Sequence, residues 1–358
     1  MFTKRNVLSK LSIPAIVLSL ALVASACGGG SGGNAANPSA GSGGSSGEVT
    51  KLETVNFAYM PDMGGATPVA VGLEKGFFKE AGINLNPVKF LSGPPEFQAM
   101  ASGDIDIAYI GPGATFLAAQ GQGQILGIVS LGKSDMVLAS KKSGITDWKG
   151  LKGKTVGVPK GTSGEMVLNL GLERAGLSPS EVNILNMDVA GAVSAFVAGK
   201  VDAVAIWNPY SAEIEKQVGK DNFVKLGDNS SFFPDYIFPS SWVVSPKFLK
   251  EKPELVNKFM QAIAKTTEYK IKNVDEAIKL TSQYTQVPEE NLRQEMTGLE
   301  WQSTEKVAQA FKDGSAVKWY DNLQTLFVKN GKMDKTVPSD TFIAKDPILK
   351  AYEALGGK

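Results

Sequence analysis

The chain has 358 residues, of which 43% are apolar and 20% charged, and its formal net charge is +1. This length suits two α/β domains or one large one, and the nearly neutral balance argues against nucleic acid as a partner, because binding phosphates needs a concentrated basic surface. There is no histidine and only one cysteine, so the commonest general base and metal ligand is missing and no disulfide can form within the chain.

Residues 1–26 have the pattern of an export signal, in which three basic residues precede the apolar run "LSIPAIVLSLALVASA". The run is short and is interrupted by proline, so it does not fit a membrane-spanning helix well. Cys27 follows directly, and "VASAC" resembles the lipobox of bacterial lipoproteins, which implies a lipid on Cys27. A plain secretory signal with an incidental cysteine is the alternative. Without the leader, 34 basic and 36 acidic residues remain.

Residues 27–48 are rich in glycine and serine and lack the apolar residues that a folded segment needs. We expect Cys27 and this flexible tether to hold the working domain, from about residue 49 onward, at the outer face of the cytoplasmic membrane or in a periplasm.

Strands alternate with helices over most of the body. In the first half, strands are predicted at 54–60, 83–91, 104–110 and 124–132, with helices at 67–82, 93–103 and 111–122. The first helix should have Thr67 as N-cap and Pro68 as its first residue. In the second half, strands are predicted around 152–158, at 181–187 and at 201–207, with helices after 161, at 190–200 and after 208. This alternation indicates parallel sheets covered on both faces.

One stretch occurs in both halves: "GDIDIAYIGPG" at 103–113 is repeated in altered form as "GKVDAVAIWNPY" at 199–210. Gly103 and Gly199 should end helices, and Asp106 and Asp202 should stand at the entry to a buried strand. Ligands of open α/β sheets bind beyond the carboxyl ends of such strands, so two facing sheets would form one shared cleft. Chance similarity between α/β units is the alternative.

The strands expected at "DMVLASKKS" and "SSWVVSPKF" bracket the second half, so the chain should cross twice between two domains and form a hinge. Domain I should comprise 49–135 and 240–358, including amphipathic C-terminal helices, and domain II should comprise 136–239.

From residue 52 to about 350 the chain resembles the solute-binding proteins of ABC importers in the nitrate, taurine and aliphatic-sulfonate group. The resemblance rests on "LEKGFFKEAGINL", "GPPEFQAMASGDIDIAYIGPG", "WKGLKGKTVGVPKGTSGEMVLNLGLERAGL" and "GKVDAVAIWNPY". It is closest to the sulfonate-binding branch, although that branch often has aspartate where this chain has Asn208. The resemblance implies an α/β type II periplasmic-binding-protein fold, a cleft that closes, and an ABC permease and ATPase as partners.

Six loops are candidates for the cleft, and five of them lead into predicted helices, whose free N–H groups and dipoles favour an anion. The loops are 61–65, 92–95, 111–113, 160–165, 190–192 and 207–209. The residues that we expect to bind ligand are Met60, Asp62, Gly93, Pro94, Tyr109, Gly111, Pro112, Thr162, Ser163, Gly191, Trp207 and Asn208.

"KGTSGE" is the clearest of these loops, because Thr162 and Ser163 offer hydroxyl donors and Lys160 offers charge, an arrangement suited to a sulfonate or similar oxyanion. The spacing of Thr162 and Glu165 also fits a capping box, which needs no ligand, and a loop lysine is usually solvated.

Trp207 follows a buried strand and should cover the apolar body of a ligand, with Tyr109 and Met60 in the same layer. Interdomain packing is the alternative for Trp207. Asp62 could hold an ammonium group of an amino-sulfonate, or it could be a solvated turn residue. Asp106 and Asp202 fit strand entry better than catalysis.

These patterns predict a lipoprotein that captures a small organosulfonate, such as taurine or an alkanesulfonate, or a related oxyanion for an ABC importer. Nitrate, bicarbonate or a thiamine-precursor pyrimidine are alternative solutes, and a ligand-sensing receptor is an alternative role. We expect no enzyme activity, cofactor or metal, because the sequence has no nucleophile elbow, P-loop or clustered metal ligands. A protein that closes around its cargo works as a monomer, so we expect a monomer.

Overall fold

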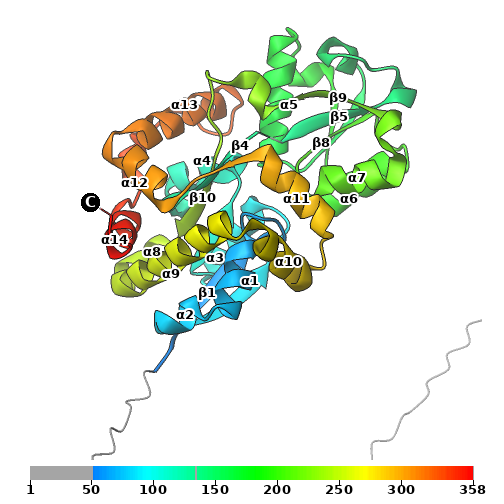
Figure 1. Cartoon of the computed structure of the whole chain (residues 1–358). Helices are drawn as coiled ribbons and strands as arrows, with labels where there is room; N and C mark the ends of the chain where they lie inside the picture. Colours follow the sequence, from blue (N-terminus) through cyan, green and yellow to red (C-terminus); the bar gives the residue numbers. More distant parts are fainter. Residues whose placement is uncertain (1–50, 134, 358) are drawn as a thin grey trace, which may run out of the picture. The chain divides into compact units, whose positions relative to one another are not determined.

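The computed structural model describes residues 51–133 and 135–357, which belong to one compact unit (Figure 1). The export signal, Cys27 and the tether lie outside the described residues. No helix in the described ranges is long and apolar enough to cross a membrane.

The first sheet has six strands, in the order β11-β4-β10-β3-β1-β2. The strands are β1 (Glu53–Tyr59), β2 (Ile83–Lys89), β3 (Ile107–Ile110), β4 (Gln124–Gly132), β10 (Pro239–Val244) and β11 (Leu299–Trp301). The second sheet has five, in the order β7-β6-β8-β5-β9. They are β5 (Met136–Ser140), β6 (Thr155–Val158), β7 (Asn183–Asn186), β8 (Ala203–Ile206) and β9 (Phe223–Asp228).

Both sheets are mixed, which corrects the prediction of parallel sheets. β10 runs antiparallel to β3 and β4, and β5 runs antiparallel to β8 and β9. The chain changes sheet between β4 and β5 and again between β9 and β10, so β5 and β10 each enter their sheet from the other one. The division into two domains with the expected bounds stays a prediction.

The repeated stretch has the same structural role in both sheets. Asp106 accepts the main-chain N–H of Asn56 at 2.8 Å and returns its own N–H to the Asn56 carbonyl. Asp202 accepts the N–H of Thr155 at 2.9 Å and bonds back to the Thr155 carbonyl in the same way. Each aspartate therefore ties the entry of the third strand to the first strand of its half, as β3 is tied to β1 and β8 to β6.

Helices cover the sheets and connect their strands (Figure 1). Beside the first sheet are α1 (Ala66–Glu74), α2 (Phe77–Glu80), α3 (Gly93–Ser102), the 3₁₀ turn η1 (Pro112–Ala114) and α4 (Thr115–Leu117); beside the second are α5 (Ser163–Arg174), α6 (Val189–Val197) and α7 (Tyr210–Val218). The C-terminal part contains α8 (Pro246–Glu251), α9 (Pro253–Lys272), α10 (Val274–Thr285), α11 (Glu289–Gly298), α12 (Thr304–Lys312), α13 (Ser315–Lys329) and α14 (Asp346–Ala354).

Two helices differ from the sequence-based expectation. α1 begins at Ala66 with Gly65 as N-cap, two residues earlier than expected, and the Thr67 hydroxyl bonds to that of Thr281 on α10 at 2.8 Å instead of capping. The helix α11 packs on α10 and also contacts α7, which lies beside the second sheet. It therefore does not pack only against elements of the first sheet, as expected for the C-terminal helices.

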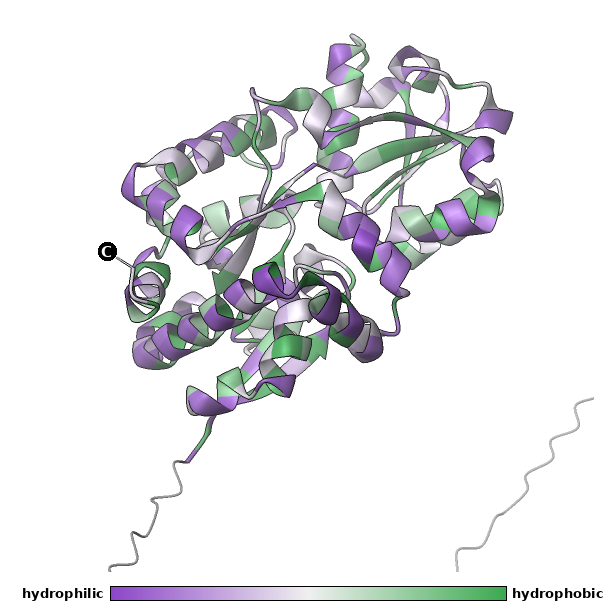
Figure 2. Ribbon diagram, viewed as in Figure 1, coloured by the Kyte–Doolittle hydropathy of each residue, from purple (hydrophilic) through white to green (hydrophobic). Residues whose placement is uncertain are grey.

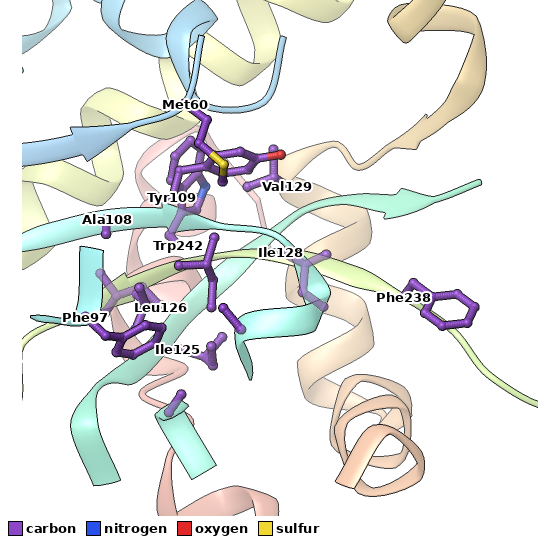
Figure 3. Packing of buried hydrophobic residues seen from close by; sticks show 14 of the residues in the cluster. Met60, Phe97, Ala108, Tyr109, Ile125, Leu126, Ile128, Val129, Phe238 and Trp242 are labelled. Atoms are coloured by element: carbon purple, nitrogen blue, oxygen red, sulfur yellow. The ribbon is translucent and has the colours of Figure 1, made fainter. Parts of the chain in front are cut away.

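Hydrophobic residues gather along the strands and the inner helix faces, while hydrophilic residues cover the outer faces (Figure 2). At the carboxyl end of β3 an aromatic layer closes the core: the Tyr109 and Phe57 rings lie 5.5 and 5.8 Å from that of Trp242, with Met60 beside them (Figure 3). These closely packed rings support the loops that follow β1 and β3.

Candidate binding site

A small cavity lies where the loops after β1, β3 and β8 meet the start of α5. Its volume is about 50 Å³. A water molecule needs roughly 10–15 Å³ of such volume, so the cavity has room for about four waters or for a ligand of few non-hydrogen atoms. Its walls come from both sheets and are formed by Met60, Asp62, Ser92, Gly93, Tyr109, Gly111, Pro112, Ala114, Gly132, Asp135, Gly161, Thr162, Ser163, Trp207, Asn208, Ser240, Glu295 and Leu299.

Most of the residues expected at the cleft line this cavity, namely Met60, Asp62, Gly93, Tyr109, Gly111, Pro112, Thr162, Ser163, Trp207 and Asn208. Pro94 and Gly191 do not line it. Pro94 instead faces Gly161, where an added Cβ would lie 2.9 Å from the proline Cγ. The Gly191 N–H instead donates to the Asp188 carboxylate at 2.6 Å, and Asp188 is the N-cap of α6.

The two predicted hydroxyl donors already donate within the protein. Thr162 Oγ1 donates to the Pro159 carbonyl at 2.6 Å, and Ser163 Oγ donates to Asp135 at 2.7 Å. Both can still accept a hydrogen bond, but neither is free to donate one to an oxyanion in this arrangement. Lys160 is exposed and does not line the cavity.

The proposed capping box at α5 does not form. Thr162 is the N-cap but makes no side-chain cap bond, and Glu165 accepts the N–H of Gly161 at 2.6 Å and the ammonium of Lys332 at 2.8 Å. Within the described ranges, the main-chain N–H groups of Ser163 and Gly164 have no protein acceptor. Of these two residues Ser163 lines the cavity, so its amide, in the first turn of α5, is the free main-chain donor that the helix start offers there.

An aromatic wall covers part of the cavity. Trp207 is 9% exposed, and its ring meets that of Tyr210 edge to face at 5.9 Å. Asn208 is occupied locally, because its side-chain oxygen accepts the hydroxyl of Ser211. Together with Tyr109 and Met60, Trp207 gives the cavity an apolar surface for the body of a ligand.

Two acidic residues in the wall were not expected from the sequence, Asp135 and Glu295. Glu295 follows Leu292 by three residues, so the two share the buried face of α11. The sequence could have pointed to Glu295, because a carboxylate on the apolar face of an amphipathic helix is unusual and indicates a buried acid. Asp135 stands just before β5, where the chain crosses between sheets, and carries no comparable pattern.

Burial dominates the electrostatics of these acids. It raises the pKa of Asp62 to about 7, against the N–H groups of Gly65 and Gly64, and that of Asp135 to about 6, against the hydroxyl of Ser163. The pKa of Glu295 is raised well above its usual range, by burial first and by the charge of Asp62 second. Behind them, burial lowers the pKa of Lys270 to about 7.

The described residues contain no group of three or more histidine, cysteine, aspartate or glutamate side chains arranged to hold a metal ion. The cavity wall therefore presents three kinds of group to a ligand: an unpaired amide at the start of α5, carboxyl groups and aromatic surface.

Comparison with known proteins gives a consistent set of relatives. The family described as "NMT1/THI5 like" matches residues 65–277. A binding protein of Brucella abortus is 34% identical over 81% of this chain and 90% of its own length. An aliphatic sulfonates-binding protein of Bacillus subtilis is 32% identical over 60% of this chain and 66% of its own length.

Solved structures show the fold. The alkanesulfonate-binding protein of Xanthomonas axonopodis pv. citri, bound to MOPS, matches 82% of this chain and 98% of its own, with a TM-score of 0.66 and 21% identity. The desulfurization enzyme DSZB matches 85% of this chain and 99% of its own, with a TM-score of 0.60 and 17% identity. The predicted type II periplasmic-binding-protein fold is confirmed by these neighbours.

Proposed function

The chain belongs to the NMT1/THI5-like family, and on this premise we propose that it is the extracytoplasmic solute-binding lipoprotein of an ABC importer. Relatives and structural neighbours named for aliphatic sulfonates and alkanesulfonates support a transport role and a location outside the cytoplasm. The permease and ATPase subunits would be its partners, and they would distinguish the ligand-closed shape from the open one.

The proposed cargo is a small organosulfonate, such as taurine or a short alkanesulfonate, or a related oxyanion. The observation that carries the proposal is the cavity of about 50 Å³ that both sheets line, with Ser163, whose main-chain amide is unpaired, in its wall. Amides at a helix start bind oxyanions without a buried counter-charge. The small volume favours a solute of few atoms.

A thiamine-precursor pyrimidine is a second candidate, because carboxyl groups beside Trp207 and Tyr109 could accept hydrogen bonds from an aminated aromatic ring. Nitrate and bicarbonate have no apolar body to cover the aromatic wall, and nitrate has no hydrogen to donate to the carboxyl groups. A receptor that only senses the solute would use the same cavity.

Calorimetric titration of the purified chain tests the cargo. Taurine and short alkanesulfonates should bind, and nitrate and bicarbonate should bind more weakly because they leave the aromatic wall uncovered. If only the pyrimidine binds, the sulfonate proposal is wrong and the second candidate replaces it.

The anchor has its own test. Replacing Cys27 with Ser should move the protein from the membrane fraction to the soluble fraction of cells that process lipoproteins, because the thioether to the lipid can no longer form. Persistent membrane attachment of Cys27→Ser would contradict lipidation.

A further inference from the structure

Buried charge around the cavity is out of balance. Asp62, Asp135 and Glu295 line it with 5%, 8% and 2% of their surfaces exposed, and the fully buried Glu96 lies behind, close enough to Asp62 for their charges to interact. The buried cation among these acids is Lys270, 3% exposed. Four buried carboxyl groups thus stand against one buried ammonium group, whose charge interacts with Glu295 and Asp62. Uncompensated buried charge is costly.

The protein itself does little to neutralise two of these acids. Asp62 accepts the N–H of Gly65 at 2.6 Å, and Glu295 accepts the N–H of Met63 at 3.0 Å with each of its oxygens. These are neutral donors. In the part of the chain that the structure describes, neither acid forms an ion pair.

Lys270 does not supply the missing partner. Its ammonium lies 3.7 Å from the centre of the Trp301 ring, a cation–π contact, and no carboxylate within the described ranges pairs with it. Glu96 is also left alone, since both of its oxygens are buried without a hydrogen-bond partner. By contrast, Asp135 is satisfied: one oxygen accepts Ser163 Oγ and the other accepts Asn229 Nδ2, both at 2.7 Å.

From this arrangement we propose that the solute carries a basic nitrogen, which docks against Asp62 and Glu295 while its anionic group meets the amide of Ser163 at the start of α5. The inference rests on the proposed function and narrows its cargo to zwitterions such as aminosulfonates. The two ends of the solute then contact different sheets, so a zwitterion joins them as neither an anion nor a cation alone could.

Protonation supports the same assignment. Burial and the charge of Asp135 raise the pKa of Asp62, while the amides of its own loop and Lys270 on α9 lower it. Glu295 on α11 and Glu96 on α3 also interact with Asp62 as groups of like charge. An arriving ammonium group would stabilise the ionised acids, so binding should release protons near neutral pH.

Taurine and isethionate form the test, because they share an ethanesulfonate and differ only in ammonium against hydroxyl. By calorimetry, the unaltered chain should bind taurine at least tenfold more tightly than isethionate. In Glu295→Gln the ratio should fall below about threefold, whereas the exposed control Glu74→Gln should keep it. Asp62→Asn is the second variant should Glu295→Gln fail to fold.

Three results would overturn the inference: isethionate binding as tightly as taurine, a taurine preference that survives both Glu295→Gln and Asp62→Asn, or no binding of taurine, isethionate or an aminopyrimidine. Binding of the aminopyrimidine alone, weakened by Glu295→Gln, would remove the sulfonate from the proposed function and leave the basic nitrogen in place.

Discussion

At the scale of single residues, Asp62 shows a conflict between binding and stability. Its carboxyl group is 5% exposed, and burial raises its pKa from 3.8 to about 7. Between these two pH values the folded chain holds a proton that the unfolded chain has lost. Folding is therefore less favourable as the pH rises through this window, by up to about 4 kcal/mol if Asp62 carries the whole shift.

We therefore expect Asp62→Asn to stabilise the ligand-free protein at pH 8 and to have little effect near pH 4. Asn keeps an oxygen for the N–H of Gly65 but has no charge to bury. Thermal unfolding at a series of pH values, against unaltered protein and the exposed control Glu74→Gln, checks this. Coincident profiles for Asp62→Asn and the unaltered chain would show that Asp62 is ionised without cost.

The residue types in the sequence predicted which loops form the cavity, but they did not predict the hydrogen bonds that the side chains of these loops make. Ser163 and Thr162 were expected as free donors, yet their hydrogens go to Asp135 and to the Pro159 carbonyl. Those acceptors come from a crossing segment and from the same turn, and only tertiary placement brings Asp135 to Ser163. Local patterns predict which loops meet, but hydrogen-bond partners 28 residues apart follow from the fold.

At the scale of elements, η1, which follows a strand of the first sheet, packs against the start of α5, which follows a strand of the second. A Cβ on Gly113 would lie 2.0 Å from the carbonyl carbon of Thr162 and 2.3 Å from the nitrogen of Ser163. Both are main-chain atoms, so no side-chain rotation can relieve the clash. Only glycine at 113 lets α5 reach this position.

We expect Gly113→Ala to weaken solute binding about five- to 150-fold, because overpacking of this kind costs about 1–3 kcal/mol and falls on the contact between η1 and α5 beside the cavity. Gly127→Ala is the control, since Gly127 does not line the cavity and its added Cβ would meet nothing closer than Met260 Cε at 3.4 Å. Calorimetry measures affinity, and small-angle scattering with saturating solute reports closure. If Gly113→Ala binds and compacts like Gly127→Ala, the contact does not control closure.

Elements that follow a clear period were predictable, and those that depend on distant partners were not. The repeat at 103–113 and 199–210 predicted equivalent strands, β3 and β8, because both the aspartate and the apolar run recur. The antiparallel entry of β5 and β10 was missed because strand direction depends on which sheet the chain joins. The contribution of α11 to the cavity was missed for the same reason, since its amphipathic pattern fits any packed helix.

At the scale of the whole described unit, two ion pairs join α5 to the last residue of α13 and to the segment that follows it, and they differ in environment. Lys332 and Glu165 lie 2.8 Å apart with 25% and 11% of their side chains exposed. Lys329 and Glu173 also pair, but with 54% and 45% exposed. Exposed pairs contribute about 0–1 kcal/mol, and shielding from water strengthens the attraction. Glu165 also holds the N–H of Gly161, which connects its pair directly to the cavity wall.

Lys332→Ala should therefore lower solute affinity by about three- to tenfold, chiefly through faster release, because the loop at Gly161 loses its link to the C-terminal segment that follows α13. Lys329→Ala, three residues earlier at the last position of α13, should change affinity less than twofold. Stopped-flow dissociation at low and high salt separates the two, since added salt should speed release from the unaltered chain toward the rate of Lys332→Ala. Equal effects of both substitutions would mean that general surface charge, and not the partly buried pair, holds α5 against the C-terminal segment while the solute is bound.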